Sequence, residues 1–288
     1  MRKIILLAAV LSILTTPLWG QISRRTLSKR PQSVAEEAPS YFTKPVDLVD
    51  LPTASILSPG DLNASLRLYE QGGLLARLSV GISRKLMFGA SYGGDYIIGG
   101  ETVKWNEQPG VHIAYRAIEE NLVMPAIVIG FDSQGYGRYG RKSDYPDAAP
   151  DEVTPSTHLL DRYSVKSRGL YVAASKGYES LWKVGLHVGA NRSLEDADGD
   201  KDYNLFLGID MQLTRDLSMV WEYDFALNDD KIKSANNAKG YLNGAMRWAF
   251  QPNMFLEFTA KNILADEQGH RDFMRIMRIV YYARIIER

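Results

Sequence analysis

The sequence contains no cysteine among its 288 residues. This absence excludes a disulfide scaffold, a thiolate metal site and a cysteine nucleophile. There is also no excess of one charge, since 34 basic residues balance 34 acidic ones, and a general nucleic-acid binder would show a basic surplus. No uninterrupted apolar run reaches the ~18–20 residues of a membrane-spanning helix. With 45% hydrophobic residues, the chain has enough apolar material for one large folded domain.

The first residues are typical of an export signal. Arg2 and Lys3 precede an apolar run from Ile4 to Leu14, and the small residue Gly20 stands before Gln21. A short basic segment, a short apolar segment and a small residue at the end predict a cleaved signal peptide at residues 1–20. We therefore expect the protein to leave the cytoplasm.

The next segment, residues 21–58, is polar and contains several prolines. This composition predicts a flexible periplasmic N-terminal segment, with a short ordered part around Leu51 to Pro59. From residue 59 to the C-terminus, apolar and polar residues alternate, as they do in β-strands. We expect twelve strands, at residues 62–70, 74–82, 86–93, 110–118, 122–132, 168–177, 181–190, 203–213, 217–227, 240–250, 254–262 and 272–283.

The connections between these strands alternate in length. Five of them have three residues, and the intervening ones are long, with 133–167 the longest. Only the connection at 71–73 is short where a long one is due. Short turns at one end, long loops at the other and an even strand number are typical of an outer-membrane antiparallel β-barrel. The sequence therefore predicts such a barrel over residues 59–288, with short periplasmic turns and long extracellular loops.

Each strand separates an apolar face from a polar one. In strand 217–227, for example, Met219, Trp221 and Tyr223 share one face, and Glu222 and Asp224 lie on the other. A membrane barrel turns the apolar face to lipid and the polar face to its lumen, whereas a soluble barrel packs apolar side chains inside. The signal peptide and the loop lengths favour the membrane barrel.

Two strands fit this pattern poorly. Pro125 cannot donate a backbone hydrogen bond, although it stands near the start of strand 122–132. In the last strand, Arg275 and Arg278 have opposite parity, so one of them would face lipid unless it lies at an interface or beside a bulge.

Many charged residues fall on the predicted inner faces. They suggest either a charged pore that orients a solute or ion pairs that fill a narrow lumen, and the sequence leaves both open. The lumen-facing candidates are Arg67, Arg77, Arg116, Lys183, Asp210, Glu222, Asp224, Arg247, Glu257 and Lys261.

The acidic stretch Asp196, Asp198, Asp200 and Asp202 surrounds Gly199. Several carboxylates in one loop could hold calcium, but the EF-hand spacing is absent. We prefer a solvated surface turn to a metal site, and we expect no cofactor.

A barrel hydrolase would need a nucleophile, a histidine and an orienting group in mutual reach. His187 near Asn191 and Ser193 is the only local cluster of this kind in the sequence. No nucleophile elbow, zinc-protease motif or phosphate loop occurs. We therefore do not expect an enzyme. A barrel lipid hydrolase whose activity depends on His187 is kept as the third hypothesis.

Three segments resemble the YjbH-like outer-membrane proteins: Phe131 to Gly135, Gly169 to Lys176, and Trp221 to Asp224. The resemblance covers scattered parts of residues 52–284 and implies a β-barrel with a link to exopolysaccharide production. Members of that family are usually much longer. The resemblance implies no catalytic residues.

The sequence predicts a barrel in the outer membrane of a Gram-negative-type bacterium, in contact with outer-membrane lipid and not with nucleic acid. Its leading function is passage or export of a hydrophilic solute, such as a surface polysaccharide. The alternative is a closed-lumen structural or interaction barrel that contacts a polysaccharide or an envelope protein through its extracellular loops. The 133–167 loop, which is rich in tyrosine, would be the contact surface.

Overall fold

The computed structural model describes residues 44–140, 161–179, 183–229, 240–264 and 273–285. The signal peptide predicted at residues 1–20 lies outside these ranges. None of the helices in the described ranges is long and apolar enough to cross a membrane.

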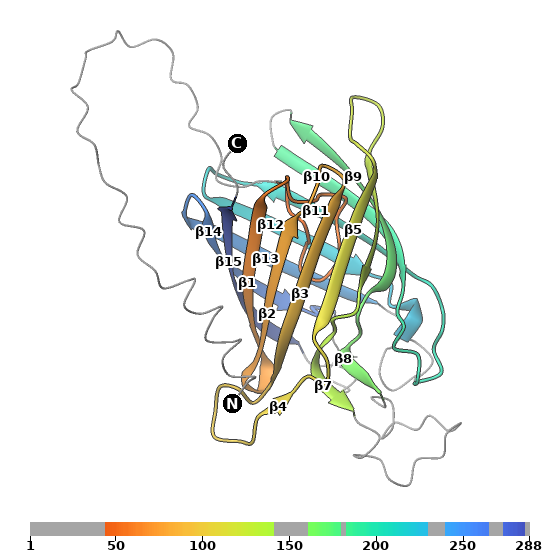
Figure 1. Cartoon of the computed structure of the whole chain (residues 1–288), viewed down its shortest axis with the longest axis vertical. Coiled ribbons are helices and arrows are strands. Elements are labelled where there is room, and N and C mark those ends of the chain that lie inside the picture. Colours follow the sequence, from red (N-terminus) through yellow and green to blue (C-terminus); the bar gives the residue numbers. More distant parts are fainter. Residues whose placement is uncertain (1–43, 141–160, 180–182, 230–239, 265–272, 286–288) are drawn as a thin grey trace, which may run out of the picture. The chain divides into compact units, whose positions relative to one another are not determined.

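Twelve antiparallel strands form a closed barrel (Figure 1). Each strand pairs with its neighbours in the order of the chain, and the first strand pairs with the last, from Asp61 opposite Arg284 to Leu68 opposite Met277. The strands are β1 (Asp61–Tyr69), β2 (Gly73–Gly81), β3 (Leu86–Asp95), β5 (Gly110–Ile118), β6 (Ala126–Asp132), β9 (Gly169–Glu179), β10 (Lys183–Arg192), β11 (Asn204–Gln212), β12 (Leu217–Asp224), β13 (Tyr241–Gln251), β14 (Met254–Lys261) and β15 (Met274–Arg284). The predicted fold class is confirmed.

The two ends of the barrel differ as the sequence predicts. At the short-turn end, β2 and β3 are separated by four residues, and β13 and β14 by two. At the long-loop end, the connections carry extra structure: β4 (Lys104–Trp105) pairs with β3, and β7 (Tyr136–Gly140) pairs with β8 (Arg162–Val165). The exception at β1–β2 is a single 3-10 turn, η1 (Glu70–Gly72).

The two faces of the barrel wall also differ as predicted. Large apolar side chains that point outward remain exposed, whereas polar and charged side chains on the same strands are buried inside. On β12, Trp221 is 38% exposed and its neighbour Glu222 is 1% exposed. The same contrast holds for other outward residues, among them Phe88, Ile113, Ile129, Val188, Leu205, Leu207, Met246, Trp248 and Phe258. A polar interior with an apolar exterior is the arrangement of an outer-membrane barrel.

The two poorly fitting strands have simple explanations. β6 begins at Ala126 instead of residue 122, so Pro125 stays outside the ladder, and Leu122 and Val123 lie in the turn at 99% and 84% exposure. In β15, Arg278 faces the lumen and is buried. Arg275 is the second residue of that strand, at the long-loop end, with its guanidinium over the ring of Phe273. The charge therefore lies near the strand end, where an interface would be.

Residues 44–57 lie inside the barrel. They fold back on themselves through a bridge between Asp47 and Pro52 and a hydrogen bond from the Leu48 N–H to the Leu51 carbonyl. We call residues 44–57 the lumenal hairpin. The expectation for residues 21–58 was a flexible periplasmic segment, and the described part of it, from residue 44 on, instead occupies the lumen. Its apolar tip residues, Leu48 and Leu51, are 0% exposed, and removal of their side chains from water favours this position.

Candidate functional site: a hairpin in the lumen

The hairpin runs through most of the lumen and returns. Near its start, Lys44 forms an ion pair with Glu120 in the turn between β5 and β6. Near its end, the carbonyl of Ile56 lies 3.5 Å from the guanidinium of Arg116. Both contacts lie at the short-turn end. The tip reaches Lys261, the last residue of β14, so it lies toward the long-loop end.

Glu222 binds the backbone of the tip. Its carboxylate accepts hydrogen bonds from the N–H groups of Val49, Asp50 and Leu51 at 3.0–3.1 Å. The side-chain amide of Asn243 donates to the same carboxylate at 2.7 Å. A buried carboxylate with several N–H donors is well satisfied, and the tip gains partners for three consecutive N–H groups that no strand supplies.

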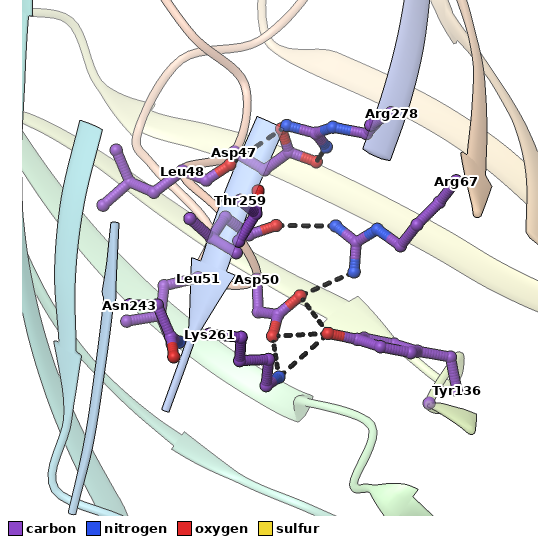
Figure 2. Close-up of polar contacts among 12 residues, drawn as sticks. Asp47, Leu48, Asp50, Leu51, Arg67, Tyr136, Asn243, Thr259, Lys261 and Arg278 are labelled. Carbon is purple, nitrogen blue, oxygen red and sulfur yellow. Dashed lines mark hydrogen bonds and ion pairs between the residues drawn. The ribbon is translucent and has the colours of Figure 1, made fainter. Parts of the chain in front are cut away.

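Asp50 lies in a pocket of cationic groups (Figure 2). Arg67 donates to its Oδ1 at 2.6 Å and Lys261 donates to its Oδ2. The Tyr136 hydroxyl contacts both carboxylate oxygens, at 2.9 and 2.8 Å. Arg168 adds a longer contact at 4.0 Å. We call Arg67, Lys261 and Tyr136 the Asp50 pocket.

A second group of charges holds the tip beside this pocket. Arg247 donates to the carbonyls of Asp47 and Leu48 at 3.0 and 2.7 Å. Arg278 donates to the Asp47 carboxylate at 2.9 Å (Figure 2). Both guanidinium groups also bind Glu257, at 2.5 and 2.8 Å, so each arginine keeps a carboxylate partner even without the hairpin.

The apolar side of the tip packs against the inner face of the barrel wall. Leu48 and Leu51 belong to a buried cluster with Phe206, Val220 and other lumen-facing side chains. A Cβ atom on Gly208 would lie 2.2 Å from the Leu48 Cδ1. Glycine at this position therefore provides the space that Leu48 fills.

Tyr136 reaches the lumen because the β7–β8 pair is fixed at the long-loop end. Arg162 of β8, 1% exposed, binds Asp198 at 2.5 Å and Asp229 at 2.7 Å. Lys166 binds Asp198 at 2.6 Å. Burial, followed by the charge of Arg162, lowers the pKa of Lys166, whereas burial raises the pKa of Glu195, which accepts the N–H groups of Tyr163 and Ser167.

The predicted lumen residues fall into three groups. Arg67, Glu222, Arg247 and Lys261 contact the hairpin directly, and Glu257 does so through the arginines. Arg77 forms an ion pair with Asp132, and Asp224 forms one with Arg168. The remaining three, Arg116, Lys183 and Asp210, line a cavity of about 480 Å³ at the short-turn end, where Arg116 also contacts the Ile56 carbonyl of the hairpin.

The acidic loop differs from the solvated turn that we preferred. Asp198 and Asp200 are 3% and 4% exposed. Asp198 binds two cations, Arg162 and Lys166, and Asp196 lies 3.9 Å from Lys201. The Asp202 N–H donates to Asp200. Within the described ranges, no group of three or more histidine, aspartate or glutamate side chains is arranged to hold a metal ion.

His187 has different neighbours from those in the sequence. Its Nδ1 lies 2.8 Å from the Ser175 Oγ, and its Nε2 lies 2.6 Å from the Asp210 carboxylate. These are the three residue types of a hydrolase triad. The Ser175 Oγ, however, also accepts the Ala54 N–H of the hairpin at 2.8 Å, so this group serves as a further anchor for the hairpin.

Sequence reasoning missed several residues of the site. The local sequence around Asp47 and Asp50 does not indicate that these residues enter the lumen, because the hairpin packs only inside the folded barrel. Arg278 was ambiguous against Arg275 by parity alone. Arg168 and Tyr136 lie in or beside the 133–167 connection, where strand periodicity says nothing.

No protein-family model and no curated protein sequence matches the chain. Among solved structures, the KdgM porin has a TM-score of 0.41 and 11% identity, over 77% of this chain and 97% of that chain. The NanC porin has a TM-score of 0.40 and 13% identity, over 77% and 99%. An outer-membrane channel from Pseudomonas putida F1 has a TM-score of 0.39 and 14% identity, over 80% and 97%.

Proposed function

We propose that this protein is an outer-membrane channel for hydrophilic solutes and that the lumenal hairpin closes it in the state described above. The observation that carries the proposal is the polar attachment of the hairpin tip. Hydrogen bonds and ion pairs to lumen side chains hold its backbone and its two aspartates. Water can replace such contacts, so a lumen without the tip would be a hydrated path lined by charged groups.

The space beside the tip supports a closed resting state. Two cavities that border Asp47 and Asp50 have volumes of only about 30 and 40 Å³. That is room for about one water molecule each. Displacement of the tip is therefore required before a solute could pass. A barrel of twelve strands has an interior that is wider than that of small filled barrels and narrower than that of wide porins.

The solute class in this proposal is hydrophilic because the lumen side chains are polar. Surface polysaccharide, which the resemblance to YjbH-like proteins implies, is one such solute. In this hypothesis the short turns face the periplasm, so the hairpin would enter the lumen from the periplasmic side.

A reversible cross-link tests the closure. Because the natural chain has no cysteine, the pair Leu48→Cys and Gly208→Cys would contain its only thiols. Leu48 contacts the Gly208 position directly, so a disulfide there would fix the tip. We expect no single-channel steps in planar bilayers from the oxidised protein and salt-dependent steps after reduction. Equal conductance before and after reduction would refute closure by the hairpin.

A second candidate is a closed barrel that acts through its extracellular loops. The small cavities beside the tip favour it. In that case the reduced double-cysteine protein and the Glu222→Ala variant would both stay silent, although heat-modifiable gel migration showed folded barrels. Capture of an envelope partner would then depend on the 133–167 connection and not on the state of the disulfide.

A further inference from the structure

We propose that the Asp50 pocket is a binding site for a small hydroxylated carboxylate solute and that Asp50 occupies this site as an internal competitor. The proposal rests on the proposed function, since a ligand reaches the pocket only when the tip leaves. Within the described ranges, the acidic partner of both Arg67 and Lys261 is Asp50. When the tip leaves, these two cations lose that partner.

The geometry of the pocket fits a carboxylate. Arg67 and Lys261 approach different oxygens of Asp50, and the Tyr136 hydroxyl lies within 2.9 Å of both. The two cations also lie over the Tyr136 ring, 4.7 and 4.9 Å from its centroid, and such cation–π contacts favour this arrangement of the three side chains. A planar group with two acceptor oxygens matches these donors.

The neighbouring side chains specify the rest of the ligand. Glu222 lies next to the pocket and accepts three N–H groups from the tip. Once the tip leaves, Glu222 needs other donors. A second carboxylate on the ligand would be repelled there, whereas hydroxyl groups would donate to it. The complementary solute thus has one carboxylate with hydroxyl groups beside it.

The other ion pairs of the lumen do not compete for this role. Arg77 keeps Asp132, Arg168 keeps Asp224, and Arg247 and Arg278 keep Glu257 when the hairpin leaves. Arg278 loses Asp47 but keeps Glu257. The Asp50 pocket is therefore the place among the described lumen residues where removal of the tip leaves two cations, Arg67 and Lys261, without a carboxylate ion-pair partner. An intramolecular carboxylate that is tethered nearby has a high effective concentration, so it weakens binding of any free competitor.

Calorimetric titration of the full-length protein in detergent with sodium glucuronate tests the site, with glucose as the uncharged control. In Asp50→Asn, the amide keeps the shape of the side chain and removes the competing charge. We expect this variant to bind glucuronate at least ~10-fold more tightly than the natural protein does, because charge-assisted hydrogen bonds are then free for the ligand. Glucose should bind neither protein measurably.

The double variant Asp50→Asn/Lys261→Met is the matched control. It should bind glucuronate at least ~10-fold more weakly than Asp50→Asn does, while heat-modifiable gel migration shows that the barrel is folded. Equal affinity of the single and double variants, or no glucuronate binding by Asp50→Asn, would overturn the proposal. Because binding is measured without a bilayer, a silent conductance record would refute only the channel, and absent binding in a conducting protein would refute only the site.

Discussion

The tip and the base of the lumenal hairpin are held in opposite ways. The tip is buried, and charged groups from β1, β12, β13, β14 and β15 converge on it. The base is held at the short-turn end by a pair in which the Lys44 side chain is 62% exposed and the Glu120 side chain 20% exposed. A cavity of about 480 Å³ lies beside it. The difference indicates that the tip supplies most of the charged contacts that hold the hairpin in the lumen, and that the ion pair at the base supplies little.

The largest effect is expected from Glu222→Ala. This change leaves three tip N–H groups without their acceptor, and each lost charge-assisted bond costs about 1.5–3 kcal/mol. Release of the tip should follow, with larger single-channel steps and fast exchange of the Val49, Asp50 and Leu51 amide protons. Glu222→Gln keeps one acceptor oxygen and should give an intermediate result. Unchanged amide exchange in Glu222→Ala would show that the other contacts hold the tip.

A smaller effect is expected from Gly208→Ala. The new Cβ would overlap the end of the Leu48 side chain, and overpacking of this kind costs about 1–3 kcal/mol. The hairpin should therefore become sensitive to protease at lower denaturant concentration than in the natural protein. Leu48→Ala in the same chain removes the overlapping atoms. If the double variant is no more protease-sensitive than Leu48→Ala alone, the contact is specific, whereas simple addition of the two effects would contradict it.

These two predictions also show what the sequence could and could not provide. The barrel follows from local patterns, since alternation, turn lengths and strand number are each visible in short segments. Glu222 was predicted to face the lumen because its parity on β12 requires it. Its role as acceptor for Val49 to Leu51 was not predictable, because that contact joins residues 171 to 173 positions apart.

Residues 21–58, which precede the barrel, show the same limit of prediction from local sequence more clearly. Polar and proline-bearing composition predicted flexibility for residues 21–58, and this rule describes a chain in water. Inside a barrel, however, the lumen supplies hydrogen-bond partners and an apolar patch that the segment itself lacks. Asp47 and Asp50 are stabilised by Arg278, Arg67 and Lys261, and nothing in the local sequence of the hairpin encodes those partners.

Ser175→Ala should have a modest effect. It removes the acceptor for the Ala54 N–H, on the returning arm of the hairpin, and a single neutral hydrogen bond contributes about 0.5–1.5 kcal/mol. Amide exchange should quicken at Ala54 and stay slow at the tip. Since Ser175 has the neighbours of a triad nucleophile, a fluorophosphonate probe gives an independent check. We expect no labelling of the natural protein, and labelling that Ser175→Ala abolishes would instead favour the hydrolase hypothesis.

The smallest effect is expected at the base, from Lys44→Ala. Burial alone would raise the pKa of Glu120, but the hydrogen bond from Lys44 and other contacts outweigh it, so this pKa lies below its ordinary value of 4.5. The Lys44–Glu120 pair therefore makes its full contribution to stability above about pH 4.5. This contribution is lost as the pH falls through the lowered pKa of Glu120.

Because Lys44 is mostly exposed, solvent and salt screen this pair, and such surface pairs contribute about 0–1 kcal/mol. Lys44→Ala should thus leave conductance near pH 7 almost unchanged, and any small difference from the natural protein should vanish in 1 M salt. Glu120→Gln is the matched change on the other side of the pair. An opening of the channel by Lys44→Ala as large as that by Glu222→Ala would reverse the comparison, and would place control of the hairpin at its base.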